Sequence, residues 1–150
     1  VCERPGVHLV KYQRVPGLSS LSKHLVVTLV ADGKDYHIAV VHLIRPIRES
    51  GIEKHGKQLM ALDSWVRSQS GAVVVMGDFN DTGKALLGLR SAGELTHWSA
   101  THLSGKSFDN IYSLPAPTQA MVQRPRYPKK PNKLTVATWT DHYLLEATVP

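Results

Sequence analysis

Acidic and amide side chains stand at the ends of short apolar runs in this sequence, at the points where a strand would stop. The series comprises Asp78, Asn80, Asp109, Asp141 and, beside the last of these, His142. A side chain at the end of a strand is held rigidly, as a metal ion or a catalytic proton transfer requires. Three such segments in succession therefore indicate a hydrolytic metal site.

These residue types fit the hydrolysis of a phosphodiester. That reaction needs an activated water, neutralised charge on the phosphoryl oxygens and a stabilised leaving oxygen. Carboxylate oxygens are ligands that Mg²⁺ prefers, and a histidine can accept or donate the proton near neutral pH. The candidate histidines are His142 and His42, which lies near the end of the apolar run 36–43.

Each residue also has a simpler structural explanation when it is taken alone. Asp78 and Asn80 could cap a helix that begins near Thr82. Asp109 could be a turn residue, and His42 could be a histidine satisfied at a strand end. Taken one at a time, these explanations would hold more often than the catalytic one, whereas three such segments in series point to a hydrolytic metal site.

Composition predicts one domain with a basic surface. The chain of 150 residues is 42% hydrophobic and 20% charged, as expected for a single globular domain over 1–150. Its formal charge of +6 favours polyanionic partners, although the same charge fits any basic protein. No segment reaches the ~18 consecutive apolar residues of a membrane span. A single cysteine, Cys2, excludes an internal disulfide, and the cellular compartment stays open.

Apolar patterns predict the strands that must position the site. Residues 25–30 and 36–43 flank an Asp-Gly turn and predict a hairpin. Residues 72–76 form a continuous apolar run, which is typical of a strand buried on both faces. The other strands are expected at residues 7–15, 134–139 and 143–149, the last two as partners.

Helical spacing predicts two helices. Apolar residues recur at Ile52, Leu59, Leu62 and Val66, so that a helix is expected over 52–69, after a loop at 45–51. A shorter helix is expected over 84–92. The order of strands, helix, strand, short helix and strands predicts an α+β fold in which a mixed sheet carries helices on one face.

Residues 115–133 differ from the rest of the chain because prolines and basic residues surround Tyr127 there. Proline stiffens such a loop, and basic residues beside an aromatic ring suit phosphate contacts and base stacking. The loop is therefore a candidate contact for nucleic acid. A solvated surface connection is the alternative.

The ordered motifs resemble the endonuclease/exonuclease/phosphatase superfamily, which has the deoxyribonuclease I-like fold. The resemblance covers residues 24–150 and rests on Val40-Val41-His42-Leu43, Gly77-Asp78-Phe79-Asn80, Ser107-Phe108-Asp109-Asn110-Ile111 and Thr140-Asp141-His142. It implies mixed β-sheet layers with flanking helices. It also implies a divalent-metal-dependent phosphodiesterase, most simply a nuclease acting on DNA or RNA, that uses Mg²⁺ or Mn²⁺. Phosphatases and phospholipases share the scaffold and are the alternative.

The resemblance implies a role for each residue of the series. Asp78 would orient the attacking water, and Asn80 would hold a phosphate oxygen from the same side of an extended stretch. Asp109 would pair with His142, which would contact the phosphate and act in acid–base catalysis. His42 would protonate the leaving group. The implied metal ligands are Asp141 and Glu3.

The sequence departs from the superfamily in its first half. Members carry an early Asn, whereas no Asn precedes Asn80 here, and Glu3 is the only glutamate before His42. The chain thus resembles the second half of the fold with a shortened first half. It could be a fragment, a compact member, or a half completed by another chain, in which case an apolar sheet face would promote self-association. A non-catalytic binding module is the remaining alternative.

Overall fold

A six-stranded mixed sheet forms the centre of the computed structural model, which describes residues 6–18, 23–80, 89–91, 100–102, 104–123, 142 and 144–150. The strand order is β1-β2-β3-β4-β6-β5, with β3 and β4 parallel and the other neighbours antiparallel. The strands are β1 (Val7–Gln13), β2 (Lys23–Ala31), β3 (Lys34–His42), β4 (Ala72–Asp78), β5 (Arg90–Ser91) and β6 (Asp109–Leu114).

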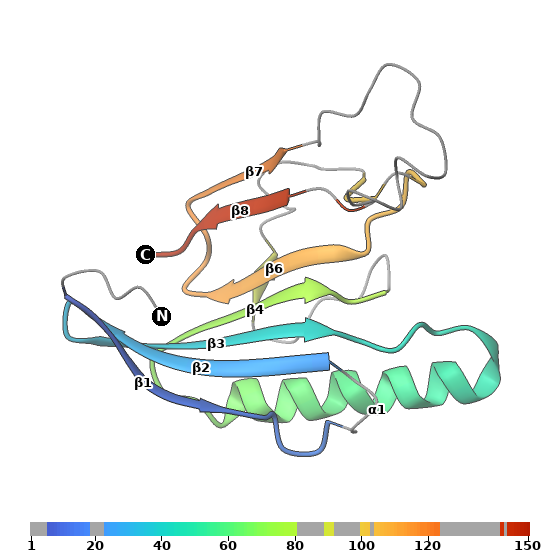
Figure 1. The fold of residues 1–150 in the computed structure, drawn as a ribbon, viewed down its shortest axis with the longest axis horizontal. Coiled ribbons are helices and arrows are strands. Elements are labelled where there is room, and N and C mark those ends of the chain that lie inside the picture. Colours follow the sequence, from blue (N-terminus) through green and yellow to red (C-terminus); the bar gives the residue numbers. More distant parts are fainter. Residues whose placement is uncertain are drawn as a thin grey trace.

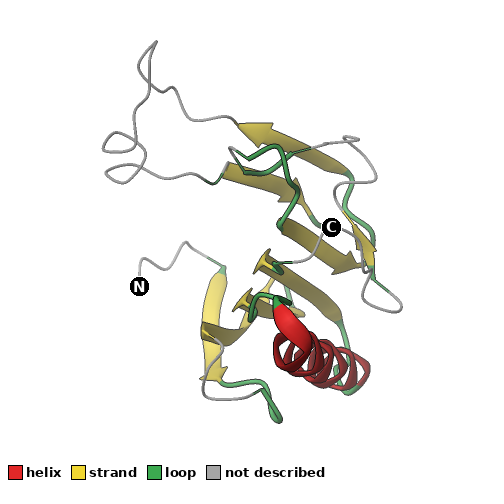
Figure 2. Ribbon diagram, turned by 90° about the vertical axis from the view of Figure 1, so that its right-hand side faces the viewer, coloured by secondary structure: helices red, strands yellow, loops and turns green. Residues whose placement is uncertain are grey.

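Layers lie on both sides of this sheet. The helix α1 (Arg48–Arg67) connects β3 to β4 and covers one face. A two-stranded antiparallel sheet of β7 (Gln119–Gln123) and β8 (Leu144–Thr148) lies on the opposite side (Figures 1 and 2). The predicted α+β architecture with a mixed sheet is therefore confirmed. No helix among the described residues is long and apolar enough to cross a membrane.

Two apolar clusters join the layers. The larger one packs the helix residues Leu62 and Trp65 against Val73 and Val75 of β4. A smaller one joins Val74 and Ile111 to side chains from the sheet of β7 and β8. Because neighbouring residues of β4 contribute to both clusters, β4 is buried on both faces, as its continuous apolar run predicts.

The predicted hairpin of β2 and β3 is confirmed. The two strands pair without interruption from Lys23 opposite His42 to Ala31 opposite Lys34. Asp32 and Gly33 connect them with φ angles of 50° and 72°. Positive φ at both central residues defines the hairpin turn that Asp-Gly favours.

The helix begins earlier than its apolar spacing predicts. Residues from Arg48 onward are helical, so the expected loop at 45–51 is wrong over its last residues. At Gly51 a Cβ would lie 2.9 Å from the carbonyl oxygen of Arg45, so this glycine lets the first turn pack closely on the preceding chain. Ile52 is 59% exposed, and the buried stripe instead includes His55 and Gln58.

Two predictions for the later chain are wrong. Residues 90–91, expected in a helix, form β5 against β6, because pairing with a neighbouring strand overrides local helix propensity. Residues 119–123, expected in the loop 115–133, form β7, which pairs with β8. The flanking prolines hide the alternation of β7, whose Ala120 packs inward opposite Ala147. The expected strand 134–139 lies outside the described residues.

Candidate active site

Four residues in register place chemical groups in one row across the sheet. Lys23 is paired with His42, His42 with Asp78, and Asp78 with Asp109, along β2, β3, β4 and β6. Side chains of directly opposed residues point to the same face of a sheet. The fold thus brings together three of the residues that the motifs single out, although they lie far apart in sequence.

Gly77 allows the strands to meet at this end of the row. Its φ angle is 130°, and a Cβ at this position would lie 2.0 Å from the carbonyl oxygen of Val41. Only glycine permits such an approach of two strands. The glycine of the Gly77-Asp78-Phe79-Asn80 motif is therefore required by the close approach of β3 and β4.

His142 contacts Asp109, as the resemblance implies. The imidazole Nδ1 lies 2.8 Å from Oδ2 and 3.1 Å from Oδ1 of the Asp109 carboxyl group. An ionised carboxylate can only accept a hydrogen bond, so Nδ1 carries the proton when Asp109 is charged. In that state Nε2 is the basic nitrogen of the ring, as general-base chemistry requires.

Thr101 holds Asp109 in place. Its hydroxyl donates to Asp109 Oδ2 at 2.9 Å and accepts the backbone N–H groups of Phe108 and Asp109, each at 3.0 Å. The Thr101 side chain is fully buried. One donor and two acceptor positions of a hydroxyl are thus all used. The chain Thr101–Asp109–His142 fixes the orientation of the imidazole.

The pKa of the Asp109 carboxyl group is raised above its ordinary value, chiefly because burial disfavours the charged form. Hydrogen bonds from His142 and Thr101 oppose the rise, while the nearby Asp78 carboxylate adds to it. Two carboxylates directly opposed on adjacent strands repel each other. A cation at this position would relieve both effects.

Asp78 and Asn80 do not lie in one extended stretch, and that prediction is wrong. Asn80 has a φ angle of 52°, and its backbone N–H donates to Asp78 Oδ1 at 2.7 Å. The Asn80 side-chain nitrogen donates to the carbonyl oxygen of Leu43 at 2.9 Å. Asn80 therefore ties the end of β4 to the chain that follows β3, while it still lines the site cavity.

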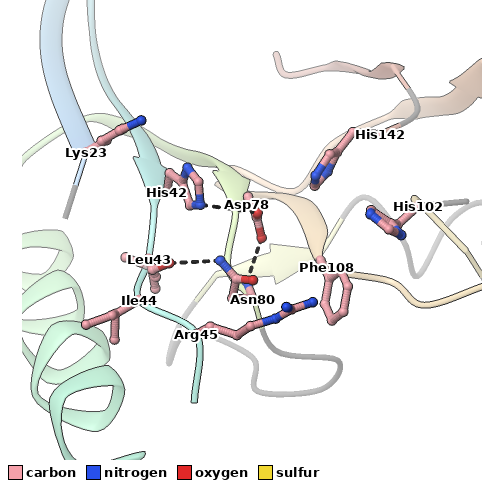
Figure 3. Close-up of a pocket in the computed structure, with 10 residues that line it drawn as sticks. All are labelled: Lys23, His42, Leu43, Ile44, Arg45, Asp78, Asn80, His102, Phe108 and His142. Carbon is pink, nitrogen blue, oxygen red and sulfur yellow. Dashed lines mark hydrogen bonds and ion pairs between the residues drawn. The ribbon is translucent and has the colours of Figure 1, made fainter. Parts of the chain in front are cut away.

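The site opens into a cavity of about 440 Å³. Figure 3 shows Asp78 near its centre, with His42 on one side and His142 on the other. His42 Nε2 lies 3.6 Å from Asp78 Oδ2. The cavity is lined by Lys23, His42, Leu43, Ile44, Arg45, Asp78, Asn80, His102, Phe108 and His142.

Two buried polar residues of α1 support the loops around this cavity. His55 contacts the carbonyl oxygen of Phe79 through Nε2 at 2.8 Å. Gln58 Oε1 accepts the backbone N–H of Ile44 at 2.9 Å. The helix thereby holds the loop after β3 and the loop after β4. The sequence signal for this role is a pair of polar residues on the same helix stripe as Leu62.

Several residues of the site have no motif in the sequence. The His102 ring makes an edge contact with the His142 ring at 4.9 Å between centroids, and the two residues form an isolated β-bridge. Arg45 and Lys23 add positive charge to the cavity wall. Lys23 could have been found from the hairpin register, because it pairs with His42. Arg45 and His102 give no such signal.

A group of three side chains could hold a metal ion. Ligand atoms of Asp78, Asp109 and His142 all lie within 4.8 Å of one another. Two carboxylates fit Mg²⁺ or Mn²⁺, and the imidazole suits Mn²⁺ better than Mg²⁺. The two residues expected as ligands, Glu3 and Asp141, lie outside the described residues.

Comparison with solved structures shows the same fold in proteins of low sequence identity. Zebrafish (D. rerio) TDP2 complexed with single strand DNA product is similar with a TM-score of 0.63 and 16% identity, over 95% of this chain and 68% of that one. The human Nocturnin catalytic domain with bound sulfate gives 0.62 and 19%, over 97% and 62%. Caenorhabditis elegans TDP2 gives 0.66 and 12%, over 93% and 65%.

These similarities confirm the deoxyribonuclease I-like fold that the motifs predict. The chain spans about two thirds of the length of these structures. The sequence matches no family model and no curated protein.

Proposed function

We propose that this protein is a divalent-metal-dependent phosphodiesterase that cleaves nucleic acid. The observation that carries the proposal is the convergence of Asp78, Asp109 and His142, with ligand atoms within 4.8 Å of one another, in a cavity that His42 and Asn80 also line. The carboxylates of Asp78 and Asp109 fit a hard divalent cation, and the His142 imidazole beside them stays available for proton transfer. Bound there, Mg²⁺ or Mn²⁺ would neutralise charge on the phosphoryl oxygens.

Each side chain then has a task. Asp78 orients the attacking water, and His142, with its Nδ1 proton directed to Asp109, contacts the phosphate and transfers protons through Nε2. His42, on the other side of Asp78, protonates the leaving oxygen (Figure 3). Asn80 contributes one N–H to Leu43 and keeps the other for a phosphate oxygen. Glu3 and Asp141 are proposed as further metal ligands.

Nucleic acid is the proposed substrate because the protein is basic. The formal charge of +6 favours a polyanion through counterion release. Within the described residues, Lys23 and Arg45 place positive charge in the same cavity as Asp78. The TDP2 structure of similar fold holds a single strand DNA product, which supports the same substrate class.

Hydrolysis of a labelled single-stranded oligonucleotide in Mg²⁺, with and without chelator, tests this proposal. His142→Ala should lower the rate about 10²–10⁴-fold, because it removes a proton-transfer group. The matched control is His8→Ala, a change at an exposed histidine of β1 outside the cavity. Full activity of His142→Ala would contradict the proposal, as would full activity in excess chelator.

Other chemistry on the same scaffold would give a different pattern. Turnover of an inositol phosphate or of sphingomyelin without cleavage of DNA or RNA would identify a phosphatase or phospholipase. A folded protein that binds oligonucleotide and hydrolyses none of these substrates would be a binding module that keeps the motifs.

A further inference from the structure

A cation–aromatic group adjoins the catalytic cavity and has no role in the chemistry above. The guanidinium carbon of Arg45 lies 5.7 Å from the centre of the Phe108 ring, and the Lys106 ammonium nitrogen lies 5.8 Å from it. Both distances allow cation–π attraction. Figure 3 shows the Arg45 side chain extending past Asn80 toward Phe108. The side chains of Arg45 and Lys106 therefore place two positive charges around Phe108, which lines the cavity.

The backbone that carries Arg45 is held at successive residues. The N–H of Leu43 donates to the carbonyl oxygen of Asp78 at 2.9 Å, and the N–H of Ile44 donates to Gln58 Oε1 at 2.9 Å. The carbonyl oxygen of Arg45 accepts the N–H of Ile47 at 2.8 Å. Little backbone ordering is therefore needed here when Arg45 binds a ligand.

Phe108 supports the cation and does not offer a surface for base stacking. Its side chain is only 7% exposed, and the His102 ring packs on it at 5.5 Å between centroids. A base needs an accessible ring face to stack. The group of Arg45, Lys106 and Phe108 therefore recognises negative charge. A guanidinium is the side chain best suited to a phosphate, because two of its N–H groups can bind two oxygens at once.

We propose that Arg45, held by Phe108 and joined by Lys106, forms a second anion subsite that binds a phosphate flanking the scissile one in an oligonucleotide. This subsite deepens the proposed nuclease function and rests on it for the position of the scissile phosphate. It predicts binding that is independent of base sequence. It also predicts that substrates with a single phosphate gain less from Arg45 than oligonucleotides do.

Binding of a fluorescein-labelled single-stranded oligonucleotide, measured by anisotropy in chelator, tests the subsite without requiring hydrolysis. Arg45→Gln should weaken binding about 3–10-fold, as for a lost charge-assisted contact at an exposed position. The slope of log Kd against log salt concentration should fall by about 0.7, the value for one phosphate contact with a single strand. Arg45→Lys keeps the charge and should recover part of the affinity and most of the slope.

The matched control is Arg48→Gln, which removes the same charge three residues later at an exposed position that does not line the cavity. An affinity and slope for Arg45→Gln equal to those of Arg48→Gln would overturn the subsite. An equal fold-loss of affinity for a one-phosphate diester, bis(p-nitrophenyl) phosphate, would also overturn the subsite, because Arg45 would then act on the scissile phosphate. The unmutated protein could show no hydrolysis of any substrate, while Arg45→Gln still lowers the affinity for the oligonucleotide and the slope of log Kd against log salt concentration. In that case the proposed catalysis fails and the subsite stands.

Discussion

Asp78 and Asp109 are directly opposed residues of β4 and β6, so two carboxylates share one face at the end of the sheet. Like charges in this position destabilise a sheet. The sequence nevertheless places both there, with Gly77 to let the strands approach and Thr101 to fix one of the pair. We interpret this arrangement as a binding position for a divalent cation, maintained at a cost in stability.

That cost predicts how stability depends on pH. Burial raises the pKa of Asp109, so the folded protein holds this proton more tightly than the unfolded chain does. Ionised Asp109 therefore lowers the free energy of unfolding above its folded pKa, and this penalty vanishes below the unfolded pKa of ~3.9. Asp109→Asn should thus be more stable than the unmutated protein near pH 7, and the difference should shrink as the pH falls toward 4.

Urea unfolding in chelator at a series of pH values measures this difference. The control is Asp35→Asn, a change at an exposed carboxylate of β3 far from the row of site residues. A stability difference for Asp109→Asn that grows as the pH is lowered would contradict the account.

Thr101 is predicted to be a positioning residue. Thr101→Val keeps the shape of the side chain but removes one of the two side-chain donors to Asp109 and leaves two backbone N–H groups without their acceptor. The free energy of unfolding should fall by about 1–3 kcal/mol. Because His142 is oriented through Asp109, the pH–rate profile should also change, and Thr101→Ser should restore both properties.

Thr118→Val is the matched control, because the Thr118 hydroxyl is exposed and makes only a 3.4 Å contact with the carbonyl oxygen of Thr148. Normal stability and a normal pH–rate profile in Thr101→Val would show that the hydroxyl has no positioning role.

A pair of glycine substitutions tests the close approach of β3 and β4. Gly77→Ala places a methyl group 2.0 Å from the Val41 carbonyl oxygen, and should cost more than about 4 kcal/mol or prevent folding. Gly56→Ala in α1 meets no atom within 4 Å and should stabilise the helix by roughly 0.5–1 kcal/mol. Comparable melting temperatures for the two variants would be incompatible with this geometry.

Much of the site could be predicted from sequence because its residues belong to strands with clear patterns. Asp78 follows an apolar run, and His42 ends a hairpin strand, so that their positions follow from strand ends. The contact of Asp109 with His142 was implied by the resemblance to a family and is present at 2.8 Å. The pairing register of β3, β4 and β6 then places His42, Asp78 and Asp109 side by side.

Other parts could not be predicted, for physical reasons. Thr101 acts through a buried hydroxyl whose partners are set only by the tertiary fold. His55 and Gln58 interrupt an apolar stripe of α1. A prediction from apolar periodicity assigns such polar residues to the exposed side of a helix. β7 is flanked by prolines, which favour loops in any local prediction. In each case packing or pairing outweighs the local preference of the residues.

Metal-dependent phosphodiester cleavage at Asp78 and Asp109 is best tested by the rate of oligonucleotide hydrolysis as a function of Mg²⁺ or Mn²⁺ concentration, for the unmutated protein and for Asp78→Asn. Asp78 and Asp109 are proposed to face a divalent cation that the reaction requires. We expect a saturable dependence on the ion and a loss of about 10²-fold or more in Asp78→Asn. Hydrolysis that needs no divalent ion, or that persists at full rate in Asp78→Asn, would contradict this expectation.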